Sequence, residues 1–342
     1  MKKYVFLFLI TLASCSSDEP PIQTTPLQWL IPQEEVFDGG PGKDGIPSID
    51  DPQFDPVENI DFLEDDDLVI GMIRNGVAKA YPHVILDWHE IVNDEVDDLH
   101  IALTYCPLTG TGIAWNRKID GNVTTFGVSG KLYNTNLIPY DRASDSYWSQ
   151  MRLDCINGEL VGRKAETISI IETSWATWKK SFPDSDVLNL NTGFNRNYDQ
   201  YPYGDYITNN NRLIFPVSNF DERLPAKERV LGLVEGERKK VYSLELFEEN
   251  RIIEDVIDGK NIIVIGSKNE NFIVAFENRG LNGLSFLEEQ LPVIAQDENG
   301  NKITLSGEIL EGPLSGTSLV KEKSFMGFFF SFGAFYEGVE IN

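Results

Sequence analysis

The chain is poor in basic residues, in cysteine and in long apolar runs. Lysine and arginine total 29 against 54 aspartates and glutamates, and the formal net charge is −25. Binding to nucleic acid or to anionic lipid depends on basic side chains, so neither partner is expected. After the N-terminal signal region, no stretch is long and apolar enough for a transmembrane helix. The acidic balance favours a soluble, self-repelling surface.

The N-terminus has the pattern of a bacterial lipoprotein signal. Two lysines precede an apolar run from Tyr4 to Leu12, which is too short to span a bilayer but suits the apolar region of a secretory signal. Small residues at 13 and 14 then precede Cys15. We predict a signal peptide over residues 1–14, with Cys15 as the lipid attachment site. The alternative is an ordinary cleaved signal with an incidental cysteine.

The residues after Cys15 are expected to form a tether and a sorting signal. Segment 15–35 is rich in Pro, Ser, Thr and Gln, which is typical of a flexible linker. Its start, Ser16-Ser17-Asp18-Glu19, resembles the signal that moves some lipoproteins to the cell surface. We therefore expect an outer membrane lipoprotein on the cell surface, or otherwise one that faces the periplasm. The lipid makes the membrane a partner.

The remaining chain is predicted to fold as an α+β protein that is predominantly β. Hydrophobic residues make up 41% of the chain and aromatic residues 11%, which is enough for a substantial core. From residue 67 onward, short β-rich runs alternate with turns. Asn75-Gly76 predicts a type I′ hairpin, because both central residues of that turn need positive φ.

An internal repeat predicts two tandem copies of one module. Residues 69–117 match the chain 161 positions later without a gap, as the following pairs show: Val69–Ile73 with Val230–Val234, Lys79-Ala-Tyr81 with Lys240-Val-Tyr242, and Ile101–Leu103 with Ile262–Val264. Two aromatic segments, Trp175–Phe182 and Phe328–Phe335, also resemble each other and predict a short helix in each copy. We expect a first β-rich module over 36–193, a connector over 194–228 and a second module over 229–342.

Reactive residues that occur in only one copy are candidates for function. His89, Glu90 and Cys106 of the first copy correspond to Asn, Arg and Ser in the second. A thiolate of Cys106 activated by His89 would be a nucleophile. Cys106 and His89 could instead bind copper or zinc, with Glu90 nearby. The spacing is not diagnostic, so a structural role for both residues remains an alternative, and whether the chain is an enzyme stays open.

A binding function is the competing prediction. The loop 192–206 is dense in Tyr and Asn, including Arg196 and Tyr198, and such side chains suit recognition of a small molecule, a glycan or a protein. Asn134 and Asp141 are further candidates for ligand binding. The same loop could instead only hold the two modules together. Cys106 and Cys155 could form one disulfide or remain separate thiols.

Several stretches together carry a family resemblance. They are DGGPGKDGIPSIDDPQF, VIGMIRNGVAKAYPHVIL, WHEIVND, TYCPLTGTGIAWNR, FGVSGKLYNTNLIPYDR, SYWSQ, TGFNRNYDQYPYGDY and FPVSNFDERLPAKERVLG. The chain resembles the DUF3179 domain proteins of bacteria and archaea over nearly all of residues 36–342. The resemblance implies an exported protein and brings no established activity. The family typically has a second cysteine where this chain has Thr109, so a dithiol mechanism is not expected. We favour a ligand-binding or scaffold lipoprotein over a metal-handling or thiol-dependent enzyme.

Overall fold

The computed structural model describes residues 1, 28–236, 238–248 and 251–342. The predicted signal peptide, the lipid attachment site at Cys15 and most of the predicted tether lie outside the described residues. Within the described part of the chain, no helix has the length and apolar character needed to cross a membrane.

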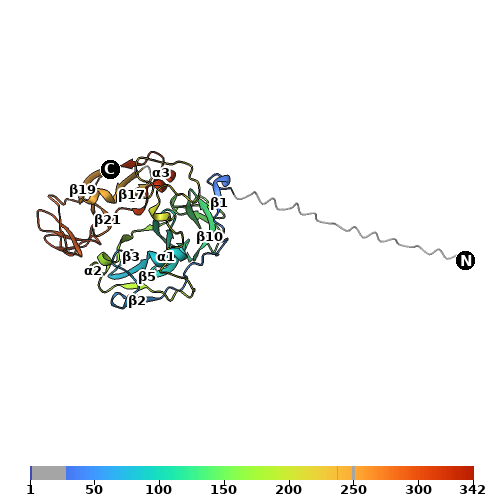
Figure 1. The fold of residues 1–342 in the computed structure, drawn as a ribbon, viewed down its shortest axis with the longest axis horizontal. Helices are drawn as coiled ribbons and strands as arrows, with labels where there is room; N and C mark the ends of the chain where they lie inside the picture. The colour runs from blue at the N-terminus through green and yellow to red at the C-terminus, as the bar shows by residue number, and fades with distance from the viewer. Residues whose placement is uncertain (2–27, 237, 249–250) are drawn as a thin grey trace.

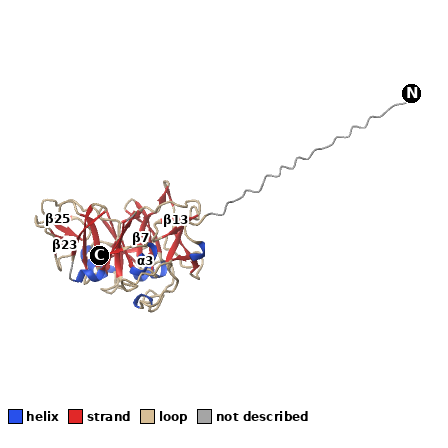
Figure 2. Ribbon diagram, turned by 90° about the horizontal axis from the view of Figure 1, so that it is seen from above, coloured by secondary structure: helices blue, strands red, loops and turns tan. Residues whose placement is uncertain are grey.

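Strands dominate the structure, as Figure 2 shows, and the prediction of a predominantly β fold is confirmed. The described residues contain three α-helices of seven residues each: α1 (His83–His89), α2 (Trp175–Ser181) and α3 (Phe329–Phe335). Four 3-10 helices accompany them: η1 (Gln33–Glu35), η2 (Val57–Asn59), η3 (Tyr206–Thr208) and η4 (Leu244–Glu248). The short helices lie mostly along one side of the strands.

The N-terminal part of the fold, residues 36–193, contains three larger sheets and one small hairpin. The first sheet has the order β15 (Ile171–Ser174), β3 (Leu68–Arg74), β4 (Val77–Pro82), β16 (Asp186–Leu188) and β2 (Phe54–Pro56). The second has the order β14 (Thr167–Ile168), β7 (Thr111–Asn116), β6 (Leu99–Cys106) and β5 (Ile91–Val96). The third has the order β1 (Val36–Asp38), β10 (Phe126–Tyr133), β11 (Asn136–Asp141), β12 (Tyr147–Ser149) and β13 (Asp154–Asn157). The hairpin joins β8 (Lys118–Ile119) and β9 (Asn122–Val123).

The C-terminal part, residues 229–342, contains three sheets. The first has the order β26 (Phe325–Phe328), β17 (Arg229–Glu235), β18 (Arg238–Ser243) and β27 (Glu340–Ile341). The second has the order β19 (Ile252–Ile257), β20 (Lys260–Ser267) and β21 (Phe272–Glu277). The third has the order β22 (Ser285–Phe286), β23 (Val293–Gln296), β24 (Lys302–Thr304) and β25 (Ile309–Glu311). Figure 1 shows β19 and β21 toward one end of the body and β1 with β10 toward the other.

Local sequence explains the entry into the first sheet. Asn75 and Gly76 have φ values of 47° and 83° and connect β3 to β4, so the predicted hairpin turn is confirmed. Pro82 then precedes α1, and the helix ends where Glu90 adopts a left-handed conformation with φ of 57°. A non-glycine residue rarely adopts this conformation, and here it turns the chain sharply into β5.

Four strands of the first sheet in each part have the same arrangement. Ile171 of β15 pairs with Gly71 of β3, and Phe325 of β26 pairs with Gly232 of β17, in both cases antiparallel. On the other side, β16 runs parallel to β4, and β27 runs parallel to β18. Asp94 accepts hydrogen bonds from Lys79 and Tyr81, and in the C-terminal part Asp255 accepts from the matching Lys and Tyr of β18.

The packing of the aromatic helices corrects one detail of the sequence alignment. The aligned aromatic segments pair Trp178 with Ser331. In the structure Trp178 lies against Gly71, and Phe332 lies in the same way against Gly232. Phe332 is therefore the packing counterpart of Trp178. The alignment was shifted by one residue, because the phenylalanine-rich segment Phe328–Phe335 offers several similar matches to the tryptophans of Trp175–Phe182. Only the contact with the glycine selects one of them.

The N-terminal and C-terminal parts pack against each other through equivalent elements. β26 lies beside β7, and β15 lies beside β21. The backbone N–H of Phe328 donates to the carbonyl of Thr109, and Thr177 donates to the carbonyl of Glu270. One hydrophobic core includes buried side chains from both parts, among them Ile113 and Val230. The parts therefore form one continuous body.

Candidate functional site

Cys106 ends β6 in a buried position, 1% exposed. Its thiol donates to the backbone carbonyl of Thr135, with 3.7 Å between sulfur and oxygen. Burial raises the pKa of the Cys106 thiol to about 11, and the nearby charge of Glu90 adds to this increase. The thiol is therefore protonated at neutral pH, which is unfavourable for a nucleophile.

Glu90 is the acidic neighbour of Cys106. Glu90 itself is the residue with left-handed backbone conformation at the end of α1, and it is buried, 6% exposed. The Tyr203 hydroxyl donates a long hydrogen bond of 3.5 Å to this carboxyl. Burial raises the pKa of Glu90 to about 7. Asp87 lies one turn earlier, and burial together with the charge of Glu90 raises its pKa well above the usual range.

His89 points into a different set of contacts. Its ring is fully buried, with Nδ1 2.8 Å from the carbonyl oxygen of Pro47 and Nε2 2.7 Å from the hydroxyl oxygen of Tyr198. A carbonyl can only accept, so Nδ1 carries the proton and Nε2 accepts from Tyr198. Burial lowers the pKa of His89 and favours this neutral form. No hydrogen bond joins His89 to Cys106 among the described residues, and the structure gives no support to their predicted pairing.

The loop 192–206 covers the segment that follows Cys106. The Tyr206 hydroxyl donates to the carbonyl of Leu108 at 2.8 Å, and Tyr201 donates to the carbonyl of Pro107 at 3.4 Å. Tyr198 also shares a hydrogen bond with Thr192. The Arg196 guanidinium lies 5.9 Å from the centre of the Trp88 ring, outside this group. The hydroxyl groups of the loop are thus engaged with the protein itself.

Asn134 and Asp141 make internal contacts. The Asn134 side chain accepts from the backbone N–H and hydroxyl of Ser218 and donates to the carbonyl of Ala334, so it joins the connector to α3. Asp141 is 1% exposed and accepts from Ser144 and from the Trp148 indole. Both side chains have their hydrogen-bonding groups occupied by the fold.

The described residues show neither a disulfide nor a cluster of metal ligands. Cys106 and Cys155 are both free and buried. No group of three or more His, Cys, Asp and Glu residues lies close enough together, within the part of the chain that the structure describes, to hold a metal ion. The polar neighbours of Cys106 are one carboxyl, Glu90, and several hydroxyl groups.

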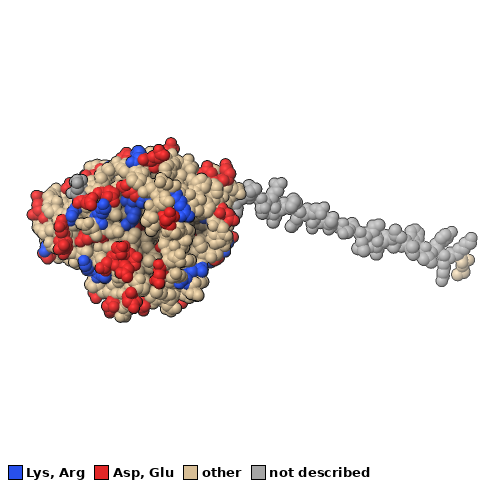
Figure 3. All heavy atoms as spheres, viewed as in Figure 1, with Lys and Arg blue, Asp and Glu red and all other residues tan. Residues whose placement is uncertain are grey.

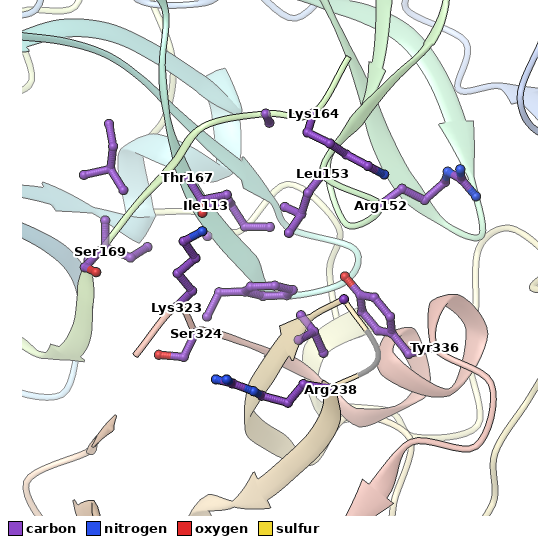
Figure 4. A pocket seen from close by; sticks show the side chains of 17 residues that line it. Ile113, Arg152, Leu153, Lys164, Thr167, Ser169, Arg238, Lys323, Ser324 and Tyr336 are labelled. Carbon is purple, nitrogen blue, oxygen red and sulfur yellow. The ribbon is translucent and has the colours of Figure 1, made fainter. Parts of the chain in front are cut away.

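A pocket of about 350 Å³ lies between the N-terminal and C-terminal parts. Four basic side chains line it, and no acidic residue does. Figure 4 shows Arg152 and Lys164 on one side of the pocket, with the Arg152 guanidinium directed away from its centre, and Arg238 and Lys323 on the opposite side. Its apolar lining includes Ile113, Leu153, Ile168, Ile170, Val234 and Phe325. We refer to this cavity as the junction pocket.

Carboxylates behind the junction pocket hold its basic side chains in place. The buried Asp154 accepts from Arg152 at 3.1 Å and from Lys164 at 3.0 Å. Arg238 pairs with the buried Glu322 at 2.5 Å. Since two cations share Asp154, their charges are not fully neutralised, and the pocket wall on that side is positive.

Reasoning from the sequence did not find the junction pocket. Arg152 and Lys164 belong to turns after β12 and β13, whereas Arg238 and Lys323 belong to the C-terminal part. No motif connects four bases at such separations. The sequence offered one general hint, namely that basic residues are few in this acidic chain. A cluster of them in the folded protein would therefore be unusual. Figure 3 shows how widely acidic side chains cover one face of the molecule.

Comparison with known proteins adds the family. The family model described as "Protein of unknown function (DUF3179)" matches residues 43–339. The chain belongs to the DUF3179 family. No curated protein and no solved structure matches it. The resemblance inferred from the sequence motifs is thereby confirmed, while the match assigns no activity to this DUF3179 protein.

In this DUF3179 protein, Thr109 has a structural role at the position where the family resemblance led us to expect a second cysteine. Its hydroxyl shares a hydrogen bond with Thr111 at 2.8 Å and accepts from Asn136 at 2.9 Å. Gln150 completes this buried network by accepting from both Thr111 and Asn136. The position therefore supplies a satisfied hydroxyl beside Cys106 in place of a second thiol.

Proposed function

We propose that this protein is a lipid-anchored envelope protein whose folded body binds a small anionic ligand in the junction pocket. The observation that carries this proposal is that Arg152, Lys164, Arg238 and Lys323 all line one pocket in a chain with a net charge of −25. The electrostatic field of such an acidic protein repels anions overall. A pocket lined by basic side chains is the place on it where an anion would bind most favourably.

The lining indicates the chemical character of the ligand. Arg152 and Lys164 share one carboxylate, which leaves positive charge for an incoming acid. Ile113, Leu153 and Phe325 offer apolar surface next to these cations. Pockets that combine apolar walls with a few charged groups typically bury the body of a ligand and orient it by its charge. We infer a ligand with an acidic group attached to an apolar body.

A tandem duplication accounts for the position of the pocket. We propose that the N-terminal and C-terminal parts are copies of one module. The matching four-strand order of their first sheets, the Gly71–Trp178 and Gly232–Phe332 contacts, and the packing of β15 beside β21 and β26 beside β7 support this proposal. Two copies that pack through equivalent surfaces create a cleft at their junction, where each copy contributes different side chains.

The membrane anchor is the second component of the proposal. The signal pattern before Cys15 and the polar segment 15–35 support lipidation and a tether, and Asp18 and Glu19 support sorting to the cell surface. We expect incorporation of an alkyne-labelled fatty acid into the full-length chain during growth in a bacterial host. A Cys15→Ser chain should show no label. Equal labelling of both chains would contradict lipidation at Cys15.

Ligand binding can be tested with 8-anilino-1-naphthalenesulfonate, a fluorescent acid with an aromatic body. We expect its fluorescence to rise on binding to the purified full-length chain. The double variant Arg152→Gln/Lys164→Gln should bind the dye at least about tenfold more weakly. A tenfold change in Kd corresponds to about 1.4 kcal/mol, and losing one hydrogen bond to a charged group costs at least about that much binding free energy. Arg74→Gln, a change at a partly exposed residue that is paired with Asp98, is the matched control. Equal affinity of all three proteins would refute the proposal.

A second candidate function rests on the electrostatic effect of Glu90 on the buried thiol of Cys106. A carboxyl whose pKa is raised to about 7 by burial can give and take protons near neutral pH, which suits acid–base chemistry. We propose a thiol-dependent enzyme, or copper or zinc binding at Cys106 with His89, as the alternative. The protonated state of Cys106 and the internal contacts of His89 make it less favoured than ligand binding.

A further inference from the structure

A second cavity, of about 170 Å³, adjoins the junction pocket. Lys164 and Ala165 line both cavities. The other walls come from the end of β7, the β8–β9 hairpin and the segment 163–166, and the aromatic side chains of Trp115, Phe126 and Trp148 lie at its base. We refer to this second cavity as the indole cavity; the segment Lys164-Ala165 borders both cavities.

Trp115, one of the residues that line the indole cavity, has an unused hydrogen-bond donor. The side chain is 1% exposed, and its indole N–H has no hydrogen-bond partner within the part of the chain that the structure describes. The neighbouring Trp148, by contrast, donates to Asp141 at 3.1 Å. A buried N–H that has lost water without gaining an acceptor is uncommon in folded proteins. An indole N–H can only donate, so the missing partner is an acceptor.

The fold itself does not require this donor. In the alignment of the two proposed copies, Trp115 corresponds to Phe276, and each side chain lies in the hydrophobic core next to a neighbouring strand. Phe276 packs there without an N–H group. Packing at this position therefore needs only an apolar ring, and the indole N–H of Trp115 is not required for it.

The charges around the indole cavity select an acidic acceptor. Lys118, Arg163 and Lys164 line it together with one acid, Glu166. Arg163 forms a salt bridge with Asp120 in the turn of the β8–β9 hairpin, and both residues are partly exposed at the rim. A carboxylate that enters could accept from the Trp115 indole and take the place of Asp120 on Arg163.

We propose that the indole cavity binds a second acidic group of the same ligand, which is therefore an elongated diacid with an apolar middle. One carboxylate contacts Arg152 and Lys164 in the junction pocket, the apolar chain passes Ala165, and the other carboxylate accepts from the indole of Trp115 and pairs with Arg163. This inference rests on the proposed function, because it uses the junction pocket for the first acid.

A series of straight-chain diacids measures the distance between the two acid sites. Succinate, adipate, suberate and sebacate are titrated into the purified full-length chain by calorimetry, each beside the monoacid of equal length. We expect one diacid length to bind about tenfold more tightly than its monoacid, the size of one charge-assisted hydrogen bond. Trp115→Phe should remove this preference and leave the affinity for the monoacid unchanged. Trp88→Phe, whose indole donates to Gln200 away from both cavities, is the control.

Arg163→Gln provides a second variant at the exposed rim in case Trp115→Phe does not fold. It should also reduce the preference for the diacid, by a smaller factor. If the native chain binds diacids no more tightly than monoacids, or if both variants keep the preference, the second acid site is overturned. In that case monoacid binding that depends on Arg152 and Lys164 still supports the proposed function. If the native chain binds no acid of the series, both proposals are overturned.

Discussion

Gly71 lies against the indole of Trp178 so closely that a Cβ atom at this position would be 1.7 Å from the ring. The glycine of β3 thus provides the space into which α2 packs its largest side chain. Gly232 and Phe332 repeat the contact in the C-terminal part, where the corresponding distance is 2.0 Å. In both parts, a glycine without a side chain allows the helix to pack closely against its sheet.

This contact predicts a strong effect of one added methyl group. Gly71→Ala should destabilise the protein by about 3 kcal/mol, because the buried ring has no free space to move into. Trp178→Phe removes the ring atoms nearest to Gly71, so the double variant should lose less stability than the two single changes together. Urea unfolding of the four proteins measures this coupling. Additive losses would show that the glycine does not act through the indole.

The buried Glu90 predicts a dependence of stability on pH. Its pKa rises from 4.5 to about 7 in the folded state because of burial, so between these values the folded chain binds more protons than the unfolded chain. The free energy of unfolding should therefore fall as pH rises from about 4.5 to about 7. The shift corresponds to about 3 kcal/mol, at 1.36 kcal/mol per pKa unit.

Glu90→Gln removes this titration and isolates its contribution. The stability of the variant relative to the native chain should increase by about 3 kcal/mol between pH 4.5 and pH 8, measured by urea unfolding across the range. Glu159→Gln, a change at an exposed glutamate, should follow the native chain. A constant difference between Glu90→Gln and the native chain would show that Glu90 is not buried in its neutral form.

The two thiols of the described fold are expected to be unreactive in the native state. Burial raises the pKa of Cys106 to about 11 and that of Cys155 to about 12, so at pH 8 about one Cys106 in a thousand is a thiolate. In a Cys15→Ser chain, Ellman's reagent should label neither thiol within minutes and both in guanidinium chloride. Rapid labelling that disappears in Cys106→Ser would instead favour the thiol-dependent alternative.

Replacing Asn134 should lower the stability of the fold without weakening ligand binding. Asn134→Ala removes its hydrogen bonds to Ser218 and Ala334 at a residue with φ of 49°, which should cost about 2 kcal/mol. Its side chain does not line the junction pocket, so the affinity for 8-anilino-1-naphthalenesulfonate should stay within about twofold, less than 0.5 kcal/mol. Asn134→Gly tolerates the positive φ and separates backbone strain from the lost hydrogen bonds. A large loss of affinity with unchanged stability would restore Asn134 as a ligand-binding residue.

Local features of the fold could be predicted from the sequence because they depend on neighbouring residues. The turn at Asn75-Gly76 follows from backbone preferences at two positions, and the prevalence of strands follows from alternating apolar runs. The matching registers of β3–β4 and β17–β18 were foreshadowed by the repeat, since equal patterns of buried residues favour equal pairings. The family was also accessible from motifs alone.

The position of each reactive side chain could not be predicted in the same way. His89 and Glu90 are adjacent in sequence, yet the left-handed turn at Glu90 sends its carboxyl toward Cys106, while His89 contacts Pro47 and Tyr198. The two neighbouring side chains have different partners, and which partners each one reaches depends on how α1 packs. The sequence placed the chemistry near the end of α1 and could not tell which of the two side chains meets the thiol.

The sequence by itself determined the β-rich class and the family to which the chain belongs. A lipoprotein signal at Cys15 and a tandem repeat stay predictions from the sequence. Only the tertiary structure decided where charge gathers. Arg152 and Lys164 meet Arg238 and Lys323 because two β-rich parts pack face to face, and that packing is directed by apolar surface such as Ile113 and Phe325. Hydrophobic packing over long sequence separations leaves no local pattern, so the junction pocket becomes visible only in the folded chain.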